Sequence, residues 1–158
     1  FKNMYLANLS IRLATIHSDL KLSGSPALTV NLTHLTNVVG KLTIDSLLSV
    51  TDLDSLVSVG SLSIRHCSEL YSVSLIGLTS THAMDISKNS LLRTLTVRSE
   101  SNETFRGAVT IKDNEQLCLP LELKQFLEAG SSSHVQECLC PPGQHLVNDT
   151  QDSHTCEH

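Results

Sequence analysis

The sequence predicts a mainly β protein: a right-handed parallel β-helix or leucine-rich solenoid of about five to six coils, with a short capping helix and a small disulfide-rich tail. One observation is a five-residue segment that ends in an apolar residue, here called the apolar phrase. Its last residue recurs at steps of 22, 20, 22 and 25 residues, which is the repeat length of stacked coils. Another is the alternation of apolar and polar residues within each phrase, which indicates a strand with one buried face. The phrases are Ser18–Leu22, Gly40–Ile44, Gly60–Ile64, His82–Ile86 and Gly107–Ile111.

Composition limits the classes of partner. The chain has 158 residues and a formal net charge of -5, without a cluster of Lys and Arg, so we expect no binding of nucleic acid. Because no apolar run reaches the roughly 18 residues of a spanning helix, we also expect no direct membrane insertion within this chain. The chain opens at Phe1 without the pattern of a secretory signal, which is typical of a processed piece.

The inward face of each coil continues beyond its strand. Six residues after the phrase, an apolar residue recurs in every coil, and further apolar residues follow at spacings of about three, which predicts three short edges per coil. The recurring residues are Leu28, Val50, Leu70, Leu92 and Leu117.

A second column tests the same register without relying on hydrophobicity. Three residues after each phrase the chain has a corner residue, and in the later coils this residue is Cys or Asn. An inward side chain that donates hydrogen bonds satisfies carbonyl groups exposed by the turn. We therefore expect Cys67 to be buried, without a disulfide partner, as one member of this stacked column of corner residues, rather than a reactive thiol. The column is Ser25, Leu47, Cys67, Asn89 and Asn114.

The pattern Leu-x-Ile-x-x-Asn-x-x-Leu, present in Met84–Leu92 and in Val109–Leu117, resembles the receptor L domain. That domain occurs in the ectodomains of insulin- and EGF-receptor relatives, and the pattern is also similar to repeats of fungal GPI-anchored cell-wall proteins. The resemblance covers about Leu9 to Gly130. It implies a leucine-rich β-helix that recognises a protein or a glycan.

Two regions follow from the pattern. Residues 1–130 are the predicted solenoid with its capping helix at about 120–129, which begins with Pro120 and ends before Gly130. Residues 131–158 are the tail, where Cys138, Cys140 and a closing Cys156 resemble the second half of an EGF-like module. That resemblance implies one disulfide between Cys140 and Cys156 and leaves Cys138 to pair with Cys118.

A zinc site is the alternative for the tail. The cysteines Cys138, Cys140 and Cys156 lie in the same segment as His154 and His158, which together offer enough nitrogen and sulfur ligands for zinc. The spacing matches no common zinc module, so the disulfide tail is favoured and no cofactor is expected.

Four N-x-S/T sequons suggest a glycoprotein. Asn102 is the best candidate because it lies in the longest polar insertion, and Asn148 in the tail is next. Asn31 and Asn8 are the other two. Together with the cysteine-rich tail, these sequons favour a secreted or cell-surface setting.

The outward positions of the main strands are the place where catalytic carboxylates would lie. Asp45 and Arg65 should be lateral neighbours that form a cross-strand charge pair, and Asp85 should stand alone among hydroxyl groups. A lone carboxylate on a solvated sheet is typical of a surface residue rather than of a general acid. No nucleophile motif or phosphate-binding glycine loop is present, and His17, His34 and His82 lie at coil corners as surface residues.

We therefore expect a module that is not an enzyme. The first hypothesis is an extracellular recognition module that binds a protein or glycan ligand over the polar face carrying Asp45, Arg65 and Asp85. The alternative is a structural building block of a cell wall, extracellular matrix or surface filament, whose partner is a further copy of itself.

Overall fold

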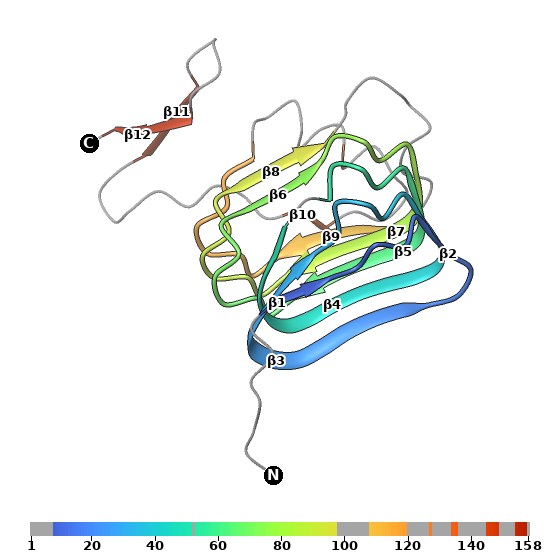
Figure 1. Cartoon of the computed structure of the whole chain (residues 1–158). Coiled ribbons are helices and arrows are strands. Elements are labelled where there is room, and N and C mark those ends of the chain that lie inside the picture. The colour runs from blue at the N-terminus through green and yellow to red at the C-terminus, as the bar shows by residue number, and fades with distance from the viewer. Residues whose placement is uncertain are drawn as a thin grey trace.

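A computed structural model describes residues 8–51, 53–97, 108–119, 127, 134–135, 145–148 and 154–157. Within these residues the chain winds into a β-solenoid whose strands stack in parallel, each strand pairing with its counterpart in the next coil (Figure 1). Almost no helix is present in this part of the chain. The predicted mainly β class and the parallel stacking are confirmed.

The strands form three sheets. The largest has eight strands in the order β1-β3-β4-β5-β7-β9-β10, with β2 paired to β4; β6 and β8 form a parallel pair, and β11 and β12 an antiparallel pair. The strands are β1 (Asn8–Ser10), β2 (Thr15–Ile16), β3 (Leu20–Asn31), β4 (Asn37–Thr51), β5 (Ser58–Arg65), β6 (Ser72–Leu75), β7 (Ser80–Ser87), β8 (Thr94–Val97), β9 (Val109–Lys112), β10 (His134–Val135), β11 (His145–Asn148) and β12 (His154–Glu157).

The register of the main sheet is the one that the apolar phrases predict. Leu42 lies opposite Leu20 on one side and Leu62 on the other, and Met84 lies opposite both Leu62 and Val109. The isoleucine or leucine two residues later stacks in the same way. Because every residue has a like residue above and below it, the alternation of each strand buries one continuous apolar column.

The solenoid makes about four turns between β3 and β9, so the predicted five to six coils are not confirmed. β1 and β2 add a short preceding segment that pairs with β3 and β4. The core runs along the axis of the solenoid and consists almost wholly of Leu, Val and Ile. Its largest fully buried side chains are Leu32, Leu35, Leu42, Ile44, Leu47, Leu56, Leu62, Ile64, Leu70, Leu75, Leu78 and Met84.

Each coil leaves the main sheet through a residue with positive φ. These residues are two positions after the last inward residue of the strand in every coil, and glycine occupies the position only once. A left-handed residue reverses the chain sharply, and it costs side chains other than glycine roughly 1 kcal/mol. The column is Gly24, Ser46, His66, Lys88 and Asp113.

The predicted corner ladder is confirmed in the later coils. Asn89 accepts a hydrogen bond from the backbone N–H of Cys67 at 3.0 Å, and its own N–H donates to the Oδ1 of Asn114 at 3.1 Å. The side-chain amide groups donate to carbonyl groups of the preceding coil, Asn89 to Ile64 at 3.1 Å and Asn114 to Ile86 at 2.9 Å. Both asparagines are fully buried. The ladder thus links three successive coils through groups that would otherwise lack partners.

Gly60 lies where two coils approach each other closely. A Cβ atom on Gly60 would lie 2.5 Å from the carbonyl oxygen of Val39 and 2.7 Å from that of Gly40. Both contacts are with backbone, which cannot move aside without separating the coils. The pairing of β4 with β5 is interrupted at this point, between Val38 and Lys41.

The capping helix and the tail are described only in part. Of the predicted helix at 120–129, Leu127 alone lies within the described residues; it is helical and fully buried, and the remainder is outside them. β10 then pairs with β9 and extends the main sheet by one strand. In the tail, β11 and β12 form a hairpin with Leu146 opposite Cys156. The cap and the EGF-like module stay predictions.

Asn89→Ala should lower the free energy of unfolding by about 2 to 6 kcal/mol. The substitution leaves the buried N–H of Cys67 and the carbonyl of Ile64 without a partner, and each such group costs roughly 1 to 3 kcal/mol. Urea unfolding followed by circular dichroism measures the change. Ser90→Ala, at the exposed neighbouring position, is the control, and equal stability of the two variants would contradict the ladder.

Candidate functional site

The outward positions of β3, β4, β5, β7 and β9 form a polar face on the main sheet. Side chains alternate along each strand, so the residues between the buried ones point away from the core. Most of these residues are partly or fully exposed, whereas Ser63 and Ser87 are covered by their neighbours. The outer face consists of Lys21, Ser23, Thr43, Asp45, Ser63, Arg65, Asp85, Ser87, Thr110 and Lys112.

The three residues predicted as the binding face lie on adjacent strands, Asp45 on β4, Arg65 on β5 and Asp85 on β7. Asp45 is directly opposite Arg65 in the register, as predicted. Asp85 is opposite Ser63 and Thr110 instead. The stacking therefore brings the three charged side chains onto one patch of the sheet.

The charge pairing on this patch differs from the predicted one. Arg65 forms its ion pair with Asp85, not with Asp45, and Asp85 also accepts a hydrogen bond from the Ser87 hydroxyl at 2.7 Å. The prediction that Asp85 stands alone is wrong. Arg65 and Asp85 are diagonal neighbours on adjacent strands, a separation that a long arginine side chain spans.

Asp45 binds a histidine that the sequence reasoning did not include. The Nδ1 atom of His66 lies 2.9 Å from Asp45 Oδ1, and the hydroxyl of Ser46 donates to the same oxygen at 3.2 Å. The hydrogen bond with His66 is the main cause that lowers the pKa of Asp45; partial burial opposes it, and Ser46 and the charges of His66 and Arg65 add to the lowering. His66 and Ser46 are both left-handed corner residues, so the corner geometry places this cluster.

The stability of the fold should fall less steeply in acid when Asp45 is replaced by Asn. The pKa of Asp45 is lower in the folded chain than its ordinary 3.8, so the unfolded chain takes up the proton first as the pH falls. The stabilisation that the Asp45 carboxylate contributes is complete above roughly pH 5, and it is lost as the pH falls through the pKa of Asp45 in the folded chain. Urea midpoints at pH 5 and pH 3 measure this, with Asp113→Asn as the control. An equal fall of the urea midpoint in wild type and in Asp45→Asn would refute the lowered pKa of Asp45.

Cys67 is a free, fully buried cysteine, as predicted. Burial raises the pKa of its thiol to about 11, and the sulfur lies 3.5 Å from the carbonyl oxygen of Arg65. A thiolate is therefore rare at neutral pH, and the group packs as a small apolar side chain.

Cys67 should resist iodoacetamide at about pH 8 in the native chain and react readily in roughly 6 M urea. With its pKa near 11 only about one thiol in a thousand is ionised at that pH, and the core also blocks the reagent. Peptide mass spectrometry of the labelled chain gives the rate. Native labelling at the unfolded rate would show that the corner column is open to solvent.

Cys118 is disulfide-bonded, and the pairings predicted for it and within the tail stay predictions. Cys138 and Cys140 lie outside the described residues, and only the backbone of Cys156 is described. The zinc alternative uses the same segment and is likewise outside the described side chains. Among the residues with described side chains, no group of three or more His, Cys, Asp and Glu is arranged to hold a metal ion.

Two of the sequons fall within the solenoid. Asn8 is exposed on β1, and Asn31 is half-buried, its side-chain oxygen accepting hydrogen bonds from the N–H of Thr33 at 3.0 Å and from the Thr33 hydroxyl. Asn102 lies outside the described residues, and for Asn148 only the backbone in β11 is described. Which of the four carries a glycan stays a prediction. His17, His34 and His82 are exposed, as expected of surface residues.

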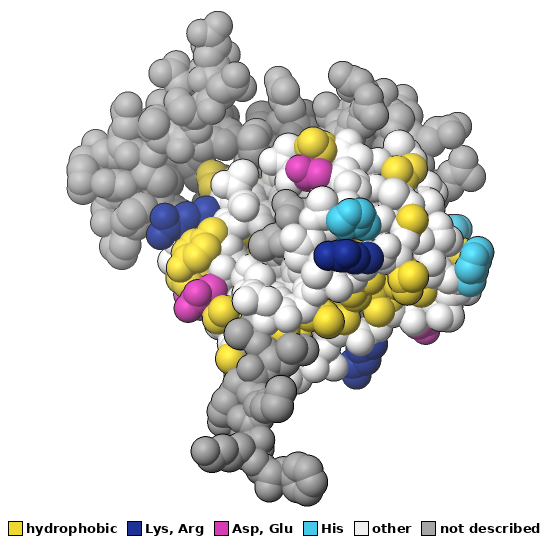
Figure 2. All heavy atoms as spheres, in the orientation of Figure 1, with side chains coloured by type: hydrophobic (Ala, Val, Ile, Leu, Met, Phe, Trp, Pro, Cys, Tyr) yellow, Lys and Arg dark blue, Asp and Glu magenta, His cyan; other side chains and the backbone are white. Residues whose placement is uncertain are grey.

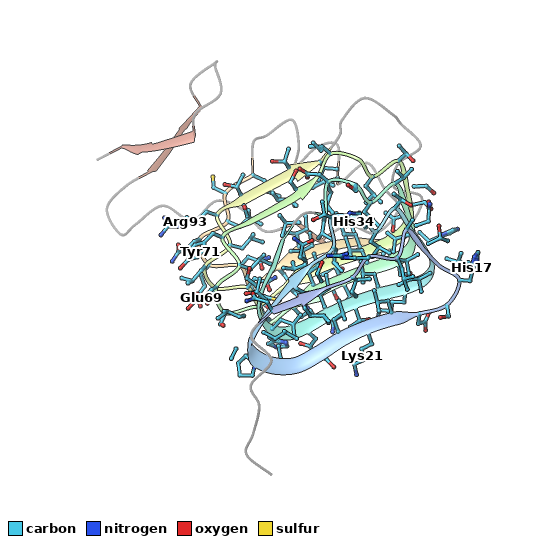
Figure 3. The ribbon with its side chains drawn as sticks, viewed as in Figure 1. His17, Lys21, His34, Glu69, Tyr71 and Arg93 are labelled. Atoms are coloured by element: carbon cyan, nitrogen blue, oxygen red, sulfur yellow. The ribbon has the colours of Figure 1, made fainter. Side chains whose placement is uncertain are left out.

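A cavity that sequence reasoning missed lies between β4 and β6. Its volume is about 390 Å³, and its walls include the exposed Tyr71, Glu69 and Asp54. Figure 3 shows Glu69 and Tyr71 along the same side of the solenoid, with Arg93 of the next coil beyond Tyr71. Its lining residues are Ser49, Val50, Leu53, Asp54, Glu69, Leu70, Tyr71, Ser72, Val73 and Ser74.

The signal for this cavity was present in the coil lengths. The coil that ends at Ile64 spans 20 residues and the next spans 22, so two residues of the longer coil have no counterpart below them. Tyr71, one of two tyrosines in a chain with 3 % aromatic residues, stands at the point where the two coils separate. A length difference alone does not say whether the extra residues bulge outward or leave a gap.

Among the described residues in the view of Figure 2, charged side chains of both signs are scattered over a surface that is mostly neither charged nor hydrophobic. Within the described ranges, no helix is both long and apolar enough to cross a membrane. In comparisons with known proteins, no family model, no curated protein and no solved structure matches the chain. The resemblance to receptor L domains therefore rests on the sequence pattern alone.

Proposed function

We propose that the chain is a non-enzymatic recognition module of a secreted or cell-surface glycoprotein, which binds a protein or a glycan on the outer face of the main sheet. The observation that carries this proposal is the presence of two neighbouring contacts on that face, one between Asp45 and His66 and one between Arg65 and Asp85. Asp45, Arg65 and Asp85 lie on three adjacent strands, and His66 lies at the corner that follows β5. The face therefore presents charges of both signs at positions fixed by the solenoid.

Fixed charges favour recognition because the partner does not have to order them. A long side chain loses roughly 0.5 to 1.5 kcal/mol of conformational freedom when an interface immobilises it. Arg65 is already held by Asp85, and Asp85 by Ser87, while the side chain of Arg65 is still 44 % exposed. Such a patch offers directional hydrogen bonds at its exposed edges.

The same contacts support the non-enzymatic assignment. Asp45 has a lowered pKa and is anionic at neutral pH, so it has no proton to give as a general acid. Asp85 is bound by a guanidinium and by a hydroxyl group. The two predicted carboxylates thus have structural partners.

The extracellular setting rests on the four sequons and the cysteine-rich tail, with the resemblance to an L domain and to part of an EGF-like module as further support. An oxidising compartment suits both features.

A second candidate function is a structural building block of a matrix, wall or filament. Between Leu20 and Gly24 the outer edge of β3 has no strand partner among the described residues, since β1 pairs only with 29–31. Partly buried Leu9, Ile11 and Leu20 lie at the same end of the core. An open strand edge beside apolar side chains is a template for pairing with a further copy.

An array experiment tests the recognition function. The biotinylated chain, tetramerised on streptavidin, is applied to printed glycans and to printed extracellular ectodomains. We expect binding to a subset of spots, reduced at least tenfold in the double variant Arg65→Asp with Asp85→Arg, which reverses the two charges and retains the ion pair. His34→Asp, at an exposed corner, is the control. Wild type that binds nothing, or equal binding by the double variant, would overturn the proposal.

Sedimentation over a range of concentrations separates the two candidates. A recognition module stays a monomer, whereas a building block with an open edge associates in steps without an end point. Leu20→Lys, which places a charge on the edge strand β3 at a position that is not on the outer face, should suppress that association and leave the array result unchanged.

A further inference from the structure

The stacking of the solenoid is interrupted on one side. There β3 pairs with β4 as far as Thr51, and β6 pairs with β8 (Figure 1). β4 and β6 belong to successive coils, and among the described residues no strand pairing joins them. Backbone hydrogen bonds still join these coils before the interruption, from Glu69 N–H to Leu48 at 2.8 Å, and after it, from Thr79 N–H to Val57 at 2.8 Å. The gap is thus bounded at both ends by regular stacking.

The cavity of about 390 Å³ occupies this gap. Its volume falls in the range of roughly 300 to 1,000 Å³ that is usual for ligand sites. The two additional residues of the longer coil explain its position, because β6 has no strand of the shorter coil beneath it in the described part of the chain.

Among the described residues β6 has no strand partner on the side away from β8, and this free edge faces the cavity. The carbonyl group of Tyr71 accepts hydrogen bonds from the N–H groups of Arg93 and Thr94, on the side of β8. Backbone groups alternate in direction along a strand, so Ser72 and Ser74 direct their N–H and C=O groups to the opposite side. Both serines line the cavity. A strand edge of this kind pairs with an added extended segment.

The side chains around the edge divide into an apolar floor and an acidic rim. Val50, Leu53, Leu70 and Val73 are buried beneath the cavity. Above them stand Tyr71, which is 51 % exposed, and the exposed carboxylates of Asp54 and Glu69. In the described part of the chain, neither carboxylate forms an ion pair.

We propose that the cavity between β4 and β6 binds an extended, basic segment of a protein partner, which pairs with the free edge of β6 and places an Arg or Lys side chain among Asp54, Glu69 and Tyr71. Two exposed carboxylates attract a cation, and an aromatic face adds a cation–π contact. The net charge of -5 favours the approach of such a segment. This site is separate from the outer face of the main sheet, and it extends the proposed function by a second contact surface.

A displayed library of random peptides, selected on the intact chain, tests the proposal. We expect enriched sequences that carry Arg or Lys next to residues with high strand propensity. Ser74→Pro removes the N–H that faces the cavity and leaves the bonds to β8 in place, so it should weaken these peptides at least tenfold. The double variant Asp54→Asn with Glu69→Gln should weaken them similarly, with a smaller loss at high salt concentration.

Matched variants control for indirect effects. Ile76→Ala shortens an exposed apolar side chain just beyond β6, and Glu115→Gln removes an exposed carboxylate in a later coil; neither residue lines the cavity. Both should bind the peptides like the wild type. Circular dichroism and urea midpoints confirm that each variant is folded before binding is compared.

The peptide experiment would overturn the proposal with any of three results: no enriched peptide, enriched peptides without basic residues, or binding that Ser74→Pro leaves unchanged. If the chain instead binds printed glycans and loses that binding in Tyr71→Ala, the cavity is a sugar site and the peptide proposal is wrong. The Arg65 and Asp85 double variant should still bind the peptides. The two sites therefore fail or succeed separately.

Discussion

The structure depends on one constraint, that each coil must return to the same register as the coil before it. In a parallel solenoid the backbone of a strand finds its hydrogen-bond partners in the neighbouring coils, so a coil that returns out of register loses both its bonds and its apolar alignment. The left-handed corner residues close each turn in the same place, and Asn89 and Asn114 bond the corners of successive coils together. Polar bonds at the corners and apolar packing along the axis thus specify the same stacking.

The constraint also determines where the two proposed binding surfaces lie. Regular stacking on the main sheet brings Asp45, Arg65 and Asp85 onto one rigid face, where their positions are set by register. Between β4 and β6 the stacking is irregular. There a coil that is two residues longer leaves the edge of β6 without a partner among the described residues, beside the cavity. Repeat proteins commonly bind through such surfaces, since their repeated units supply arrays and their departures from the repeat supply pockets.

Much of the fold could be predicted from the sequence, because the recurring phrase and its alternation determine which residues stack. The opposition of Leu42 with Leu62, the burial of Cys67 and the adjacency of Asp45 and Arg65 all follow from register. The ion pair of Arg65 with Asp85 and the contact of Asp45 with His66 could not, since they depend on side-chain reach and on the backbone angles of a corner. The cavity depends on how a coil accommodates two additional residues, which spacing does not specify.

The account rests most directly on the bonds between the corner asparagines and the preceding coil. Long-range NMR correlations across hydrogen bonds would detect them, from the side-chain amide nitrogen of Asn89 to the carbonyl carbon of Ile64 and from that of Asn114 to Ile86. The stacked solenoid predicts both correlations, with side-chain amide protons that exchange slowly with water. Fast exchange of both amides, or correlations to other carbonyl groups, would contradict the register on which the face and the cavity depend.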